Sequence, residues 1–180
     1  EGGQVWHLLP ELPAGTVLRG EVDWARRFDH MQQHSGQHIL SQAFERALGA
    51  PTVSFHLGEE ICTIDLELAE LASEQAARVE DLANAVIFED RAITAQEYGQ
   101  DALAALALRK APTVQGRVRI VEVAGFDRCA CGGTHVRSAG EIGLVHITRW
   151  EKRRNQARVE FLCGWRALRD YRVRDATARQ

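Results

Sequence analysis

The sequence predicts an α+β fold in which helices pack on a mixed or antiparallel sheet, preceded by remnants of a small β subdomain. Helical and β-rich segments both occur, they follow no regular βαβ alternation, and the chain contains no internal repeats. The 180 residues, 45% of them hydrophobic and 26% charged, suffice for one substantial core or two small ones.

The first 27 residues are rich in Gly and Pro, and their apolar stretches VWHLLPEL and TVLRGEV predict strands of the β subdomain. Apolar residues then recur at helical spacing from Met31 to about Leu48, which predicts the first helix of the main domain. Gly49 and Pro51 end this pattern.

The next two segments, 52–58 and 61–68, are β-rich and alternate between apolar and polar residues, which predicts a hairpin. A second helix is expected to run to Glu89, with Ser73 as its N-cap. Two further strands with a short helix between them, an antiparallel pair and an arginine-rich helix complete the fold. The two strands are expected at 91–98 and 118–125, with the short helix at 101–110. The antiparallel pair is expected at 143–151 and 157–164, and the arginine-rich helix from 165 to about 179.

No apolar run approaches the roughly 20 residues that span a bilayer, and the first residues lack the basic start and apolar block of a signal peptide. We therefore expect a cytoplasmic protein without membrane association. Four cysteines give no disulfide framework, so clustered thiols are expected to be metal ligands or buried apolar residues. Cys62 and Cys163 lie in strand-like runs and are expected in the core.

Two histidine-containing motifs predict a zinc site. His34 and His38 are four residues apart in the first helix and therefore share one face. The motif CACGGTH supplies Cys131 and His135 with the same spacing on a glycine-containing loop. Thiolate and imidazole are the ligands that Zn²⁺ prefers, so these four residues could complete a tetrahedron. Cys129 competes with Cys131, which is favoured because it is closer to His135.

The residues between the two histidines exclude a metalloprotease, because the glutamate of HExxH is missing. A glycine within a helix lowers helix stability by about 1 kcal/mol relative to alanine. Gly36 is therefore expected to be there because it lets a ligand or a backbone segment come close to the helix. Gln37 could donate and accept hydrogen bonds in the reaction. The amides of Gly132 and Gly133 are candidate donors to an oxyanion or a carbonyl.

HSGQHIL followed by CGGTHVRSAGEIG resembles the editing domain of alanyl-tRNA synthetases and the free-standing alanyl-tRNA editing proteins of AlaX type. The segments VDWARRFDHMQQHSGQHILS, VSFHLGEEICTIDLE and ARVEFLCGWRAL are similar to segments of the free-standing proteins, in the same order, so nearly the whole chain takes part. A related alternative is the threonyl-tRNA editing domain, whose second motif usually has a proline where this chain has Thr134.

The resemblance implies a zinc-dependent hydrolase that acts in trans on the acceptor end of tRNA(Ala) carrying a wrong amino acid, serine or, in second place, glycine. Its zinc ligands map onto the four residues above. Gly3 and Gln4 resemble the end of a glycine-rich motif that senses the amino acid, although the strands expected after that motif are missing or short. Ser54, His56 and Thr134 are implied to border the substrate pocket.

The resemblance also implies the domain organisation. Residues 1–27 correspond to part of the β subdomain, 28–163 to the zinc-binding editing domain, and 164–180 to a helix leading toward a further domain that serves tRNA contact or homodimerisation in longer members.

The C-terminal part of the chain is basic: residues 149–180 hold 10 Lys and Arg against 4 Asp and Glu, within a net charge of −3. A basic turn, KRRNQ, joins the last two expected strands. Cations there could bind acceptor-stem phosphates, although a solvated turn also explains them. The candidate tRNA-binding residues are Arg149, Lys152, Arg153, Arg154 and Arg158. A function of another class, a zinc-stabilised tRNA-binding module without catalysis, is also consistent with the sequence.

Overall fold

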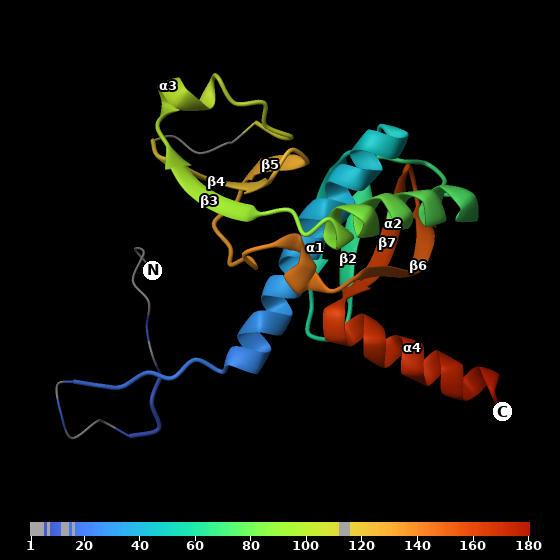
Figure 1. Ribbon diagram of the computed structural model, residues 1–180, viewed down its shortest axis with the longest axis horizontal. Coiled ribbons are helices and arrows are strands. Elements are labelled where there is room, and N and C mark those ends of the chain that lie inside the picture. Colours follow the sequence, from blue (N-terminus) through green and yellow to red (C-terminus); the bar gives the residue numbers. More distant parts are fainter. Residues whose placement is uncertain (1–5, 7, 12–14, 16, 112–115) are drawn as a thin grey trace.

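The structure, a computed structural model, describes residues 6, 8–11, 15, 17–111 and 116–180 (Figure 1). This part of the chain forms two antiparallel sheets and four α-helices, which confirms the predicted α+β class. None of its helices is both long and apolar enough to cross a lipid bilayer. In chain order the elements are α1 (Trp24–Leu48), β1 (Thr52–Leu57), β2 (Cys62–Leu66), α2 (Ser73–Phe88), β3 (Ile93–Tyr98), α3 (Gln100–Leu103), β4 (Val118–Val123), β5 (Asp127–Ala130), the 3₁₀ helix η1 (Ala139–Ile142), β6 (Val145–Arg153), β7 (Gln156–Cys163) and α4 (Gly164–Ala178).

The larger sheet has the strand order β1-β2-β7-β6, and α1 and α2 lie across one of its faces (Figure 1). The main core lies between these helices and the sheet. Ile39 and Phe44 of α1, Ile64 of β2, Val79 of α2 and Phe161 of β7 are completely buried there. Burial of such side chains supplies the main driving force for folding.

The smaller sheet has the order β3-β4-β5, and its central strand β4 packs on both of its faces. Val121 and Val123 of β4 belong to the main core. Val118 and Ile120, on the other face of the same strand, pack with Leu103 of α3 in a separate small cluster. The smaller sheet is therefore fixed against the body that carries α1.

Hydrogen bonds of glutamine side chains fix α1 to the larger sheet. The amide of Gln33 donates to the Cys163 carbonyl (3.1 Å) and accepts from the Cys163 N–H (2.9 Å), as a backbone partner would. Gln32 donates to the carbonyl of Glu141 in η1 (2.9 Å). Both glutamines are buried, so these bonds fix the rotation of the helix just before His34.

The structure differs from the prediction before residue 31. Helix α1 begins at Trp24 because the Asp23 carboxylate accepts the Arg26 N–H (3.1 Å) and caps the first turn. The described residues before it contain no strand, so the strand predictions for VWHLLPEL and TVLRGEV are wrong for these residues. Their apolar side chains are exposed, as shown by Leu8 at 98% and Val17 at 89%, and no neighbouring strand pairs with them.

Three local predictions also need correction. Ser73 is the first residue of α2, whose N-cap is Ala72, and the Gln75 side chain accepts the Ala72 N–H (3.0 Å) in place of a serine cap. The helix expected at 101–110 is only the short α3. Strand β5 and helix η1 were not predicted. The other expected strands and helices are present, with shifted ends.

Candidate metal centre

Helix α1 and the loop after β5 bring the four predicted ligands together. His34 and His38 are successive on one face of α1, and their ring centroids are 5.3 Å apart. The loop adds Cys131 and His135, so that one ligand atom from each residue lies within 4.8 Å of every other.

The donor atoms lie close enough together for a metal ion. The Cys131 Sγ lies 3.4 Å from His34 Nε2 and 3.3 Å from His135 Nε2. Ligands of a tetrahedral zinc with bonds of about 2.0–2.3 Å are about 3.5 Å apart, which agrees with these two separations. Three imidazoles and one thiolate are a donor set of the kind that Zn²⁺ prefers.

Neighbouring side chains orient two of the imidazoles. Asp127 Oδ2 binds His38 Nδ1 (3.2 Å), while Arg109 Nε donates to the other carboxylate oxygen (2.8 Å). Ser35 Oγ lies 3.1 Å from His135 Nδ1 and also accepts the Val136 N–H (3.1 Å). In both rings Nδ1 is thereby engaged and Nε2 is left for a metal, the arrangement that metal-binding histidines commonly have.

The protonation states of Cys131 and His135 suit metal ligands, whereas His38 must give up a proton to bind a metal. Burial raises the pKa of the Cys131 thiol, but hydrogen bonds from His135, His34 and His38 outweigh it and bring the pKa to about 3, which is a thiolate at neutral pH. Burial lowers the pKa of His135 to about 4, so this imidazole is neutral. Burial lowers the pKa of His38, but the hydrogen bond to Asp127 raises it, and the net pKa lies above the ordinary value.

Gly133 allows the loop to approach α1. A Cβ at this position would lie 2.2 Å from Cε1 of the His34 ring, so no other residue fits here without displacing a ligand. The Gly133 N–H points to the Cys131 Sγ (3.4 Å) and stabilises the thiolate. Its amide is therefore directed at the thiolate rather than at an oxyanion, whereas Gly132 is exposed beside it.

Gly36 serves packing. A Cβ on it would lie 2.2 Å from the Cys163 Sγ, in the core and on the side of β7. The close neighbour that this glycine admits is therefore a core cysteine, and the expectation of a ligand or a backbone segment is wrong. Cys62 and Cys163 are completely buried, as predicted.

Gln37 is buried, and its amide nitrogen donates to the Ser41 hydroxyl (2.8 Å), one turn further along α1. The hydroxyl also accepts from Thr52 of β1 (2.8 Å). The side-chain amide thus lies among groups between α1 and β1, and its catalytic role stays a prediction. Thr134 is exposed in the loop beside the ligands.

The strand register places Phe55, which the sequence analysis did not single out, on the side of the metal centre. Phe55 pairs with the core residue Ile64 and lies with its ring centroid 6.2 Å from that of His34. Ser54 and His56 are on the opposite face of β1, where the Ser54 hydroxyl binds Asp65 (2.6 Å). The structure does not bring these two residues to the ligands, and Gly3 and Gln4 lie outside the described residues.

The basic hairpin of β6 and β7 carries carboxylates beside its cations. Most of the candidate phosphate-binding side chains already form ion pairs, while Arg154 forms none among the described residues and sits at the turn with φ of 55°. The pairs are Arg158 with Asp65 (2.7 Å), Lys152 with Glu70 (2.8 Å), Arg153 with Glu151 (2.6 Å) and Arg149 with Glu151 (3.5 Å).

Sequence reasoning missed the residues that support the ligands, notably Asp127, Arg109 and Ser35. Asp127 lies four positions before Cys131, but an aspartate at this spacing from a cysteine does not belong to a specific sequence motif. Only its burial, at 3% exposure, together with its contact to His38 reveals the role.

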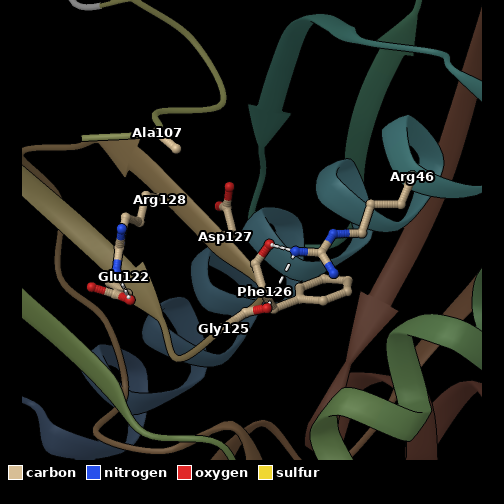
Figure 2. Close-up of a pocket in the computed structure, with 7 residues that line it drawn as sticks. All are labelled: Arg46, Ala107, Glu122, Gly125, Phe126, Asp127 and Arg128. Carbon is tan, nitrogen blue, oxygen red and sulfur yellow. Dashed lines mark hydrogen bonds and ion pairs between the residues drawn. The ribbon is translucent and has the colours of Figure 1, made fainter. Parts of the chain in front are cut away.

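A shallow pocket of about 200 Å³ lies beside Asp127 (Figure 2). Arg46 donates to the carbonyls of Phe126 (2.5 Å) and Gly125 (3.3 Å) and stacks on the Phe126 ring at 4.4 Å. Arg128 at the other side pairs with Glu122 (2.8 Å). Both cations of this pocket are thus engaged within the protein, so it offers no free positive charge to a ligand.

Comparison with known proteins finds relatives that match nearly the whole chain. Residues 118–160, which include Cys131 and His135, match the family described as the threonyl and alanyl tRNA synthetase second additional domain. The chain is 34% identical over 185 residues to the alanyl-tRNA editing protein AlaX-L of Pyrococcus horikoshii, which covers 95% of this chain and 46% of the relative. The chain is a homologue of the alanyl-tRNA editing proteins.

The chain is also 34% identical to alanyl-tRNA editing protein Aarsd1 of Rattus norvegicus (93% of the chain, 42% of the relative) and 33% identical to the alanine–tRNA ligase of Pyrococcus abyssi (87% of the chain, 18% of the relative). The chain therefore spans less than half the length of these alanyl-tRNA editing homologues and a smaller share of the ligase.

Proposed function

We propose that the protein hydrolyses the ester of tRNA(Ala) that carries a wrong amino acid, serine or glycine, with Zn²⁺ held by His34, His38, Cys131 and His135. The observation that carries this proposal is the convergence of these four side chains to within 4.8 Å in a homologue of alanyl-tRNA editing proteins. The aminoacyl ester is already activated, so the missing glutamate between the histidines does not prevent hydrolysis.

A bound zinc ion would supply Lewis-acid polarisation and lower the pKa of a water molecule toward roughly 7 if a coordination position is open. With all four protein ligands bound, it would instead position the loop and the substrate end. In either case the Asp127 carboxylate accepts from Nδ1 of His38, and the Ser35 hydroxyl engages Nδ1 of His135, so that both rings present Nε2.

Phe55 offers a surface for the end of the tRNA. Its side chain is 54% exposed although it lies next to His34. An aromatic ring that is open to solvent beside the ligands can stack on the terminal adenine or cover the aminoacyl group. The exposed amide of Gly132 remains the better placed of the two glycine donors, because that of Gly133 is directed at the thiolate.

The direct test is a deacylation assay with seryl-, glycyl- and alanyl-tRNA(Ala), with and without a chelator. We expect loss of the serine or glycine ester, retention of the alanine ester, and inhibition by the chelator. Cys131→Ala should abolish hydrolysis and remove zinc, while Cys129→Ala, which deletes a thiol two residues earlier, should keep both.

Other outcomes separate the alternatives. Binding of tRNA without loss of any ester would establish a zinc-stabilised binding module, and hydrolysis of seryl-tRNA(Thr) in preference to seryl-tRNA(Ala) would establish the threonyl type. Full activity in Cys131→Ala would refute a mechanism centred on zinc.

A further inference from the structure

One arginine of the smaller sheet holds the turn that carries the thiolate ligand. Arg119 is half-buried on β4, and one of its nitrogens, Nη1, donates to the carbonyl oxygens of both Cys131 (2.7 Å) and Gly133 (2.9 Å). Its backbone carbonyl also accepts the Cys131 N–H (3.0 Å). The backbone and the side chain of a single residue therefore hold both ends of this turn.

The guanidinium group of Arg119 is committed to these carbonyls. Arg117, just before β4, and Arg128 of β5 pair with Glu97 (3.0 Å) and Glu122 (2.8 Å), whereas no ion pair of Arg119 exists among the described residues. Hydrogen bonds from a charged donor are stronger than those between neutral groups, and two bonds on one nitrogen restrict the turn more than one would.

The turn that Arg119 closes determines three features of the ligand set. It directs the Gly133 N–H to the Cys131 Sγ, it places Gly133 against the His34 ring, and it leads into His135. If the two carbonyls were released, the loop could move away from α1, and the distances from Sγ to the two imidazoles would no longer be fixed.

We propose that Arg119 is a positioning residue that preorganises the Cys131–Gly133 turn for the metal. This inference rests on the proposed metal centre and adds to it a residue that touches neither metal nor substrate. Residues that orient metal ligands typically change metal affinity by roughly 10- to 100-fold when they are replaced, and we expect a loss of this size for Arg119→Met.

The experiment titrates metal-free protein with Co²⁺ and measures affinity by competition with a chelator, together with the near-ultraviolet absorption of the thiolate–cobalt bond. Arg119→Met should bind roughly 10- to 100-fold more weakly, with a shifted or weakened band. Arg119→Lys keeps the charge, but its ammonium sits on a shorter, more flexible side chain and does not reach the position of Nη1 as well, so it should lose less, though still several-fold. Arg117→Met removes the same charge two residues earlier and should behave as the wild type.

Thermal unfolding of the metal-free variants separates positioning from folding, since a positioning role lowers metal affinity in a protein that is still folded. Wild-type affinity and absorption in Arg119→Met would overturn the inference. If Arg119→Met does not fold, the metal affinity of Arg119→Lys is the test, and wild-type affinity in Arg119→Lys would equally overturn the inference. Failure of the wild type itself to bind Co²⁺ through a thiolate would instead overturn the metal centre.

Discussion

Two glycines show how much a single missing side chain determines in this protein. Gly133 leaves space for a ligand ring and Gly36 leaves space for a core thiol, and in each case an added Cβ would lie 2.2 Å from the neighbouring atom. Both requirements come from contacts with another segment of the chain. The sequence shows that the glycines are present, but it does not show what approaches them.

Replacing Gly36 tests the packing of α1 on β7. Gly36→Ala gains about 1 kcal/mol of helix propensity, but overpacking against Cys163 costs about 1–3 kcal/mol, so the unfolding free energy should fall. Urea denaturation of Gly36→Ala, Cys163→Ala and the double variant measures this effect. The double variant should lose less than the sum of the two single changes, and simple additivity would show that the two residues do not compete for space.

Replacing Phe55 tests the substrate side of the site. Because base–aromatic stacking contributes about 1–3 kcal/mol, Phe55→Ala should lower kcat/KM for mischarged tRNA roughly 5- to 150-fold, mainly through KM. Zinc content should stay at the wild-type level. Ser54→Ala, on the opposite face of β1, is the control and should leave the kinetics unchanged. An equal effect of the two substitutions would place the substrate elsewhere.

At the scale of elements, helix α4 is held by a few polar contacts near its start. Arg166 of α4 binds the Asp29 carboxylate of α1 (2.6 Å) and the Gly58 carbonyl (2.7 Å). Further along, His146 of β6 lies between Glu80 of α2 (3.2 Å) and Asp170 of α4 (4.0 Å). These contacts tie α4 to α1 and to β6, and β6 in turn to α2.

The His146 contacts make stability depend on pH. The hydrogen bond to Glu80 raises the pKa of His146 above its ordinary 6.5, with Asp170 adding to the effect and Arg174 opposing it. The stabilisation is therefore complete below about pH 6.5 and is lost as the pH rises through the raised pKa. Since the ring is partly exposed, we expect this contact to contribute no more than about 1 kcal/mol to the free energy of unfolding.

The unfolding free energies of wild type and His146→Gln should differ at about pH 5.5 and converge at about pH 8.5. A difference that does not vary with pH would contradict the charge effect.

The elements that could be predicted from the sequence are those with a strong periodic pattern, such as α1, α4 and the hairpins. Strand β5 was missed because its four residues, DRCA, carry two charges and no alternation, and only pairing with β4 makes them a strand. The four ligands could be predicted because each pair has its own local spacing. The roles of Asp127, Arg119 and Phe55 could not be predicted, since they depend on strand register and on contacts between the smaller sheet and α1.

At the scale of the molecule, charge is distributed so that the cations of the basic hairpin are largely neutralised by carboxylates of the hairpin and of the segment around β2. A phosphate that binds Lys152 or Arg153 must compete with Glu70 or Glu151, whereas Arg154 at the turn has no such competitor among the described residues. We therefore expect Arg154 to be the first of these residues to meet tRNA, if the hairpin contributes to binding.

Charge reversal on the hairpin measures that contribution. Each phosphate contact that is lost should reduce the slope of log K against log salt by about 1, so Arg154→Glu should lower it by about 1 and the triple reversal at 152–154 by no more than about 3. Arg117→Glu, just before β4 and away from the hairpin in the sequence, is the control. An unchanged slope in the triple variant would exclude the hairpin from tRNA contact.

The two halves of the ligand set lie far apart along the chain: Cys131 is 97 residues from His34, yet the Sγ of one is 3.4 Å from the Nε2 of the other. During synthesis, the helix with its histidines leaves the ribosome long before the thiolate exists. The four side chains can converge only after the smaller sheet has formed and docked on α1, so retention of a metal would report this docking step.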